Sequence, residues 1–366
     1  MNTKNSVLTL LMLLLLAACS TQNVKIGWLG PLTGTASTYG VPELNAARLA
    51  VDEINNAGGI NGKQVELIVE DGKCEAVGTT TAAKKLIEID QVKYVLGGHC
   101  STETMALMPI SEQNKIFIMA GATGTTSFTN AGKYAFRTFP SAQILYSRLA
   151  EVAREQGTKT VATLAEQKDW LKSVVGSFAT RFEQLGGRIV TRETYEPGTS
   201  DFRSQLLKID SLMPDAVMIS VQGPDSAAQI IKQMRELGIS QQIYGDALVV
   251  NTATFQKTGE LLPPTALGAL PIADTNNFKT SQLLARYNSR FGEIGTNPFY
   301  VTESYDGANI VLSLVTQCGD DVDCARQILL SRTWEGATGN LTFTPDGEPT
   351  SFIKIVRIEN GTMVFV

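Results

Sequence analysis

Residues 24–34 read VKIGWLGPLTG, and residues 46–62 read AARLAVDEINNAGGING. The first stretch alternates apolar residues and then becomes rich in glycine, which is typical of a β-strand that ends in a turn. The second carries apolar residues at helical spacing, and Gly58-Gly59 ends the predicted helix. Residues 65–69 alternate again and predict a second strand. A strand, a helix and a strand in this order indicate a parallel β-sheet covered by helices.

The same alternation continues along the chain. A helix is predicted over residues 79–89 and strands over 92–96 and 116–119, of which the last is wholly apolar, as expected for a strand buried on both faces. The pattern starts again after Pro140. Its predicted elements are helices at 145–156, 174–185, 202–209 and 227–237, and strands at 160–164, 188–190, 216–221 and 242–244. We therefore predict an α/β fold with two doubly wound parallel-sheet lobes.

The N-terminal residues predict export. Lys4 precedes an apolar run at residues 7–16, and Leu16-Ala17-Ala18-Cys19 follows at once. A run of about ten apolar residues is too short to span a bilayer but suits a signal peptide. The small residues before Cys19 resemble a bacterial lipobox, whose cysteine is acylated; an ordinary secretory signal is the alternative. We expect a signal peptide at 1–18 and a protein held on a membrane, on its periplasmic or cell-surface side, by a lipid on Cys19 only.

The remaining four cysteines predict disulfides. Cys74, Cys100, Cys318 and Cys324 are an even number in an oxidising compartment, and their local spacing favours the pairs 74–100 and 318–324. The chain-entropy model gives these bridges roughly 3.5 and 2.4 kcal/mol. A metal site is the rival interpretation, but the chain has one histidine and no Cys-x-x-Cys motif, so we expect no metal.

Composition and motifs argue against nucleic-acid binding and against catalysis. The net charge is −5 and there is no basic run. Residues 58–64 look like a phosphate loop but are one residue short, and Gln64 stands where a hydroxyl should bind magnesium. His99 follows Gly97-Gly98 at a predicted strand end, where an active site is conceivable, yet no elbow motif supplies a serine. We expect neither an enzyme nor a cofactor.

Three predicted strand ends are small, polar and rich in glycine. They are residues 30–34, followed by Tyr39, residues 97–102, and residues 120–125. Ligands bind parallel sheets at the carboxyl ends of their strands. Hydroxyls and backbone N–H groups at helix starts suit a carboxylate. Helix capping by Ser101 and Thr123 is the alternative, and both roles can coexist.

The stretches at 30–34 and 46–62, with Gly121-Ala122-Thr123, resemble the leucine/isoleucine/valine-binding protein family. These are type I periplasmic binding proteins of branched-chain amino acid ABC transporters, and the resemblance covers essentially the whole mature chain. It implies two lobes joined by three crossovers, with the ligand in the cleft. The lobes implied are 22–140 with 272–345, and 141–271 with 346–366. The family's first-lobe disulfide falls on Cys74 and Cys100.

In the first lobe the resemblance assigns the ligand's carboxylate. Ser101 and Thr123 match the residues that hold it, and Gly121 contributes its backbone. Tyr39 matches an aromatic residue that packs on the ligand's side chain. The neighbouring strand-end residues that complete this predicted half-site are Thr102 and Ala122.

In the second lobe this sequence departs from the family pattern. Trp170 stands where the family often has tyrosine, and Gln222 lies in a segment that can carry another. Asp246-Ala247 occupies the place of a glutamate that takes the ligand's ammonium, and Asp246 is one position off. Tyr300 is expected on the apolar side of the ligand. These departures weaken the branched-chain preference.

The resemblance implies a function. We expect a monomeric, exported lipoprotein that captures a small polar solute, an amino acid, and delivers it to ABC permease subunits. The alternative is a sensor of the same fold for an amide, a urea or a small carboxylate. A buried ammonium needs an ionised partner. If Asp246 points away, a ligand without an ammonium is therefore favoured.

Overall fold

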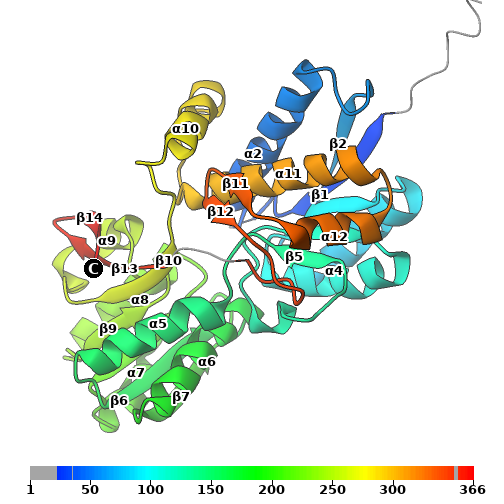
Figure 1. Cartoon of the computed structure of the whole chain (residues 1–366). Helices are drawn as coiled ribbons and strands as arrows, with labels where there is room; N and C mark the ends of the chain where they lie inside the picture. Colours follow the sequence, from blue (N-terminus) through cyan, green and yellow to red (C-terminus); the bar gives the residue numbers. More distant parts are fainter. Residues whose placement is uncertain (1–22, 35, 350–352) are drawn as a thin grey trace, which may run out of the picture.

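The computed structural model describes residues 23–34, 36–349 and 353–366. The predicted signal peptide and Cys19 lie outside the described residues. The described chain forms two lobes, each built around one large β-sheet, and its C-terminus lies on the second lobe (Figure 1). A hairpin of β11 (Trp334–Gly336) and β12 (Gly339–Leu341) forms a third, small sheet. The predicted α/β class with two helix-covered sheets is confirmed.

The sheet of the first lobe has five parallel strands. In spatial order they are β2 (Val65–Asp71), β1 (Val24–Gly30), β3 (Tyr94–Gly97), β4 (Phe117–Ala120) and β5 (Ala135–Arg137). The helices around it are α2 (Ser37–Asn56), α3 (Ala76–Lys84), the π-helix η1 (Lys85–Ile89), α4 (Ser101–Asn114), α10 (Phe278–Phe291), α11 (Phe299–Cys318) and α12 (Val322–Ser331). Successive strand residues point to opposite faces. Trp28 therefore packs into the core under α2, α11 and α12, and Leu29 into the core under α3 and α4.

The sheet of the second lobe has seven strands. In spatial order they are β14 (Thr362–Phe365), β13 (Ile353–Glu359), β10 (Leu267–Pro271), β9 (Gln242–Gly245), β8 (Ala216–Ser220), β6 (Thr160–Glu166) and β7 (Arg188–Tyr195). The pairs β10–β13 and β13–β14 are antiparallel, and the other pairs are parallel. Its helices are α5 (Ala142–Glu155), α6 (Asp169–Gln184), α7 (Arg203–Ser211), α8 (Pro224–Glu236) and α9 (Thr252–Thr258). Helices α5 and α6 cover one face of this sheet, and α7 and α8 cover the other.

The chain passes between the lobes three times. The passages lie between β5 and α5, between β10 and α10, and between β12 and β13. After the second passage α11 returns to pack on α2, as Figure 1 shows. Each sheet is therefore assembled from separate segments of sequence, and the residues at which one lobe ends stay a prediction.

Both predicted disulfides are confirmed. Cys74 is bonded to Cys100, and Cys318 to Cys324. The first bridge ties the end of β2 to the residue before α4. The second joins the end of α11 to α12. Within the described residues, no helix is both long enough and apolar enough to cross a membrane.

The expected helix at 79–89 is confirmed: α3 runs to Lys84 and the π-helix η1 continues it to Ile89. The helix caps expected as the alternative role of Ser101 and Thr123 were wrong. Ser101 does not cap α4: it is the first helical residue and Cys100 is the cap, because Glu103 reaches back to the Cys100 N–H. Thr123 caps no helix, since its hydroxyl bonds the carbonyls of Gly98 and His99. The sequence of α4 shows almost no helical apolar period, whereas α10 and α12 are amphipathic and were not assigned from the sequence.

Candidate ligand-binding cleft

A cleft lies between the two lobes, and the empty space of about 800 Å³ between its walls includes open solvent. Strand ends and helix starts of both lobes, and the passages between them, supply its walls. Five aromatic rings line it: those of Tyr39, Phe139, Tyr146, Trp170 and Tyr300.

One end of the cleft is built to receive an anion. Ser101 and Thr102, at the start of α4, both line the cleft, and in the described structure no protein group accepts a hydrogen bond from their backbone N–H groups. The Ser101 hydroxyl oxygen accepts a bond from the Thr125 N–H at 3.2 Å, which leaves its proton free to donate. Free N–H groups at a helix N-terminus attract negative charge. A carboxylate fits this position.

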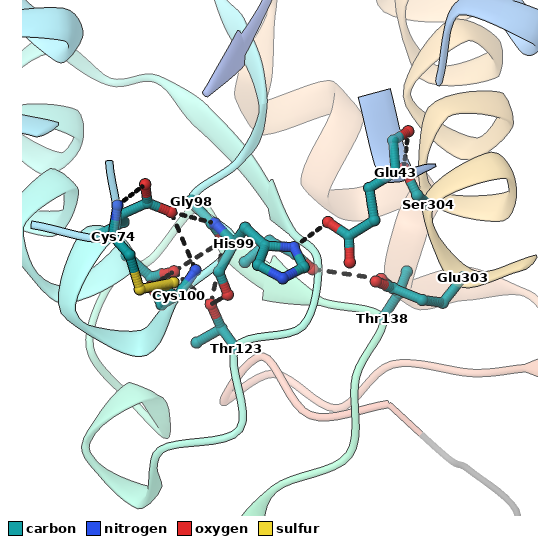
Figure 2. Close-up of polar contacts among 12 residues, drawn as sticks. Glu43, Cys74, Gly98, His99, Cys100, Thr123, Thr138, Glu303 and Ser304 are labelled. Atoms are coloured by element: carbon teal, nitrogen blue, oxygen red, sulfur yellow. Dashed lines mark hydrogen bonds and ion pairs between the residues drawn. A yellow bond between two sulfur atoms is a disulfide. The ribbon is translucent and has the colours of Figure 1, made fainter. Parts of the chain in front are cut away.

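The start of α4 is fixed in place by Glu103 and a disulfide. One Glu103 oxygen accepts from the Cys74 N–H at 2.8 Å, and the other from the His99 and Cys100 N–H groups at 3.1 and 3.0 Å. The Cys74–Cys100 bridge spans the same place (Figure 2). A site held this rigidly loses little conformational entropy when a ligand arrives.

The aromatic side chains that line the cleft pack on one another. Tyr39 stacks on His99 with ring centroids 4.8 Å apart and lies 5.8 Å from Tyr300. Phe139 is parallel to Tyr300 at 6.2 Å and perpendicular to Trp170 at 5.9 Å. Offset-stacked and edge-to-face arrangements at these distances are favourable for aromatic groups. An apolar ligand body can contact these rings in the cleft.

The lobes touch each other around the cleft. The Gln222 side-chain amide donates to the Tyr39 hydroxyl at 2.9 Å, and the hydroxyls of Ser173 and Thr125 lie 3.0 Å apart. Trp170, at the start of α6, packs against Gly124, where a Cβ atom would lie only 2.0 Å from its ring. Each contact joins a residue of one lobe to a residue of the other.

Asp246 lies in the cleft wall but its carboxylate is fully engaged. One oxygen accepts from the Ser220 hydroxyl and the Val221 N–H, both at 2.8 Å. The other accepts from the N–H groups of Leu248 and Val249 at 2.8 and 3.0 Å. A carboxylate has about four acceptor positions. All are taken, so Asp246 anchors the loop after β9 to the end of β8.

Charge in the cleft is sparse. Burial raises the pKa of Asp246 to about 6, although its four hydrogen bonds oppose the shift. Among the described residues that line the cleft, Asp246 is the one acidic side chain and Lys168 the one cationic side chain. The Lys168 ammonium lies 3.9 Å from the carboxylate of Glu166, behind the cleft wall. The cleft therefore offers donors and a cation, and no free carboxylate.

Eight of the ten predicted ligand residues line the cleft: Tyr39, Ser101, Thr102, Ala122, Trp170, Gln222, Asp246 and Tyr300. The two others do not. The Thr123 side chain is fully buried and donates to backbone carbonyls (Figure 2). Gly121 lines a smaller, separate cavity that His99 also lines. The individual roles given to these residues stay predictions.

The sequence interpretation missed several lining residues. Lys168 follows the end of β6, so the same strand-end rule applied to the second lobe would have found it. Tyr146 belongs to the apolar stripe of α5 and gave no separate signal. Phe139 lies on the passage between β5 and α5, and Asn297 lies in the loop between α10 and α11; neither segment has a local pattern that predicts its course.

Comparisons with known proteins agree with this geometry. A family model described as "Periplasmic binding protein" matches residues 23–362. The leucine-, isoleucine-, valine-, threonine- and alanine-binding protein of Pseudomonas aeruginosa is 24% identical over 334 residues, which cover 90% of this chain and 88% of that protein.

Two solved structures share the fold. The branched-chain amino acid transporter substrate-binding protein of Streptococcus pneumoniae, in complex with isoleucine, superposes with a TM-score of 0.81 at 23% identity, covering 94% of this chain and 99% of that chain. A solute-binding protein of an ABC transporter from Rhodopseudomonas palustris, in complex with p-hydroxybenzoic acid, superposes at 0.84 and 19% identity, covering 94% and 95%. Proteins of this shape thus hold ligands with and without an ammonium.

Proposed function

The chain belongs to the periplasmic binding protein family, and from this we propose that it is the solute-binding component of an ABC importer that captures a small organic carboxylate and performs no chemistry on it. The observation that carries the proposal is the free start of α4, which opens into an aromatic cleft between two lobes. N–H groups and hydroxyls there compensate the cost of removing a carboxylate from water. A sensor of the same fold would bind the same ligand without delivering it.

We infer the class of ligand from the residues that would surround the rest of the molecule once its carboxylate is bound at the start of α4. Asp246, which the family resemblance places next to the position of a glutamate that takes the ligand's ammonium, has no acceptor position left for one. Burying an unpaired ammonium is prohibitive. The aromatic side chains of the cleft wall suit an apolar ligand body. We therefore propose an aromatic or aliphatic carboxylate without an α-ammonium, the kind of ligand held by the Rhodopseudomonas structure.

A neutral amino acid is the second candidate. The Pseudomonas relative is named for five such ligands, and that name supports the amino-acid interpretation of the sequence. An amino acid can bind to this chain only if carbonyl or hydroxyl groups accept hydrogen bonds from its ammonium, because the described residues that line the cleft include no unengaged carboxylate. The sequence similarity and the cleft chemistry thus favour different ligands.

Capture is proposed to proceed by closure of the lobes about their three passages. The lobes are residues 22–140 with 272–345 and residues 141–271 with 346–366. Contacts between Tyr39 and Gln222, and between Trp170 and Gly124, lie where the lobes meet and form only when they approach. A monomer suffices for this motion, since both lobes belong to one chain.

A ligand screen tests the function. The exported chain is heated with benzoate, 4-hydroxybenzoate, 4-methylpentanoate, the neutral amino acids, small amides and urea. A ligand at 100 times its Kd should add about 2.7 kcal/mol to the free energy of unfolding. We expect carboxylates to raise the melting temperature and to be recovered unchanged. Turnover of a ligand, or stabilisation by no member of the panel, contradicts the proposal.

The family works outside the cytoplasm, and we propose that this chain is held there by a lipid on Cys19. The protein with Cys19→Ser should appear in the soluble extracytoplasmic fraction, because an apolar run of about ten residues is too short to anchor it. Fractionation and immunoblotting measure this, with Ser20→Ala as the control that should remain on the membrane. Membrane association that survives the loss of Cys19 rules out the anchor.

A further inference from the structure

A cluster of ionisable side chains lies inside the first lobe, directly behind His99 (Figure 2). Glu43 comes from α2, His99 from the loop between β3 and α4, Glu103 from the first turn of α4, and Glu303 from α11. The side chains belong to residues that are at most 3% exposed. Charged groups so deeply buried are rare unless they are paired. The proposed function makes no use of Glu43 or Glu303.

Contacts with His99 and Thr138 engage only one carboxyl oxygen of each of the two glutamates, Glu43 and Glu303. Nδ1 of His99 contacts one oxygen of Glu43, and the Thr138 hydroxyl donates to one oxygen of Glu303. The second oxygens of Glu43 and of Glu303 are buried and have no partner other than the opposite carboxyl group among the described residues, and a hydrogen bond between two carboxyl groups needs a proton on one of them. A small cavity beside them is lined by Glu43, His99 and Gly121, among others. Two buried carboxyl oxygens next to a void favour protons on the carboxyl groups.

The electrostatics of the site agree with that geometry. Burial raises the pKa of Glu43 well above its ordinary value of 4.5, and burial together with Glu43 does the same for Glu303. Burial lowers the pKa of His99 to about 4. The other ionisable groups that act on the cluster are Glu103, on α4, and the tyrosine hydroxyls of α2 and α11, Tyr39 and Tyr300.

No lysine or arginine acts on these groups in the described structure. The cluster of Glu43, His99 and Glu303 is therefore neutral when it holds two protons. Both can lie on the carboxyl groups, or one can lie on the imidazole beside an ionised Glu43. Loss of one proton leaves a buried, unpaired negative charge.

His99 connects this cluster to the cleft. Its ring lines the cleft on one side and the small cavity on the other, and Tyr39 stacks on it. Ser101, at the proposed anion position, is two residues away. A carboxylate bound there is repelled by a deprotonated cluster and tolerated by a neutral one, since charges on buried groups are screened less than charges in water.

We propose that capture of the carboxylate is coupled to a proton, which the Glu43–His99–Glu303 cluster takes from solvent when the anionic ligand binds. The coupling rests on the proposed function, because only an anionic ligand favours the protonated cluster. No covalent bond changes apart from the O–H bond formed on one carboxylate. The cleft thereby selects an anion although three acidic residues lie close behind it.

The sign of the pH dependence follows. The cluster loses its proton over a range of pH, called the window here, and the raised pKa values of Glu43 and Glu303 place this window above pH 4.5. Below the window the cluster is neutral and affinity does not change. As pH rises through it, the free protein loses the proton first, and Kd increases by up to tenfold per pH unit. Once the complex has also lost the proton, Kd becomes constant again.

The test is calorimetry with benzoate and with 4-methylpentanoate as probes, at several pH values from 5 to 9, in phosphate and in Tris buffers. These buffers differ in ionisation enthalpy, so the difference in heat counts the protons taken up. We expect uptake approaching one proton within the window. Glu303→Gln, which imitates a protonated carboxyl group, should abolish the uptake and flatten the pH profile while binding persists. Glu43→Gln provides a second variant of the same kind.

The matched control is Glu112→Gln, a carboxyl group of α4 that is not part of the cluster, and it should retain the uptake. Binding without proton uptake at every pH, or uptake that survives both cluster substitutions, overturns the coupling and leaves the proposed function standing. Failure of every carboxylate to bind overturns the proposed function, and the coupling with it.

Discussion

Gly124→Ala is expected to weaken ligand binding by about 10- to 100-fold. The added Cβ would lie 2.0 Å from Cζ3 and 2.6 Å from Cη2 of Trp170. Gly124 belongs to the loop after β4 in the first lobe and Trp170 to α6 in the second, so the overlap arises only when the lobes meet. Overpacking of this kind costs roughly 1 to 3 kcal/mol, and each 1.4 kcal/mol is about tenfold in Kd. Calorimetry measures the change.

Two further variants separate closure from general damage. Gly176→Ala places a methyl group on α6, the helix of Trp170, where nothing lies within 4 Å, and it should leave Kd unchanged. Trp170→Phe removes the ring atoms that collide with the new methyl group, so combining it with Gly124→Ala should restore much of the lost affinity. An unchanged Kd in the single Gly124 variant means that the two lobes do not need this contact to hold the ligand.

Asp246→Asn is expected to lower the free energy of unfolding by about 3 kcal/mol while leaving the affinity for carboxylates nearly unchanged. Four donors point at the Asp246 oxygens, three of them backbone N–H groups. An asparagine offers one acceptor oxygen and turns an NH₂ group toward the other donors. Each donor left unsatisfied costs roughly 1 to 3 kcal/mol. Denaturant unfolding at pH 8, where the carboxyl group is ionised, measures the loss.

The matched control for this change is Asp225→Asn. Asp225 is exposed at the start of α8, where it pairs with Lys257. Exposed pairs contribute about 0 to 1 kcal/mol, so little change is expected. An Asp246 variant of normal stability that has lost amino-acid binding would show instead that this carboxylate holds a ligand's ammonium.

The periodic parts of the fold were predictable, because alternation and helical spacing follow directly from burial. Val24–Gly30 forms the predicted first strand, and the polar residues after the strand ends do meet in one cleft. The position of a residue at the end of a strand predicts that it lies near the site, but it does not predict the direction of its side chain. Thr123 turns toward the buried carbonyls of Gly98 and His99, which only the folded loops bring within reach.

Tertiary contacts decided the rest of the site. Nothing in the sequence excluded Asp246 as the partner of an ammonium. In the structure its carboxylate already accepts hydrogen bonds from the N–H groups of Val221, after β8, and of Leu248, in its own loop. Glu43 and Glu303 are far apart in the chain, and as acidic residues on helices they look solvent-exposed. Packing of α11 on α2 buries both and brings them together behind His99.

The most direct test of the account is a calorimetric titration with 4-methylpentanoate, leucine and 4-methylpentanamide. The first two differ in one ammonium, and the first and third in the carboxylate. We predict that 4-methylpentanoate binds at least tenfold more tightly than leucine, whose ammonium finds no free carboxylate, and more tightly than the amide, which cannot use the charge at the start of α4. Leucine binding more tightly than 4-methylpentanoate would contradict the account.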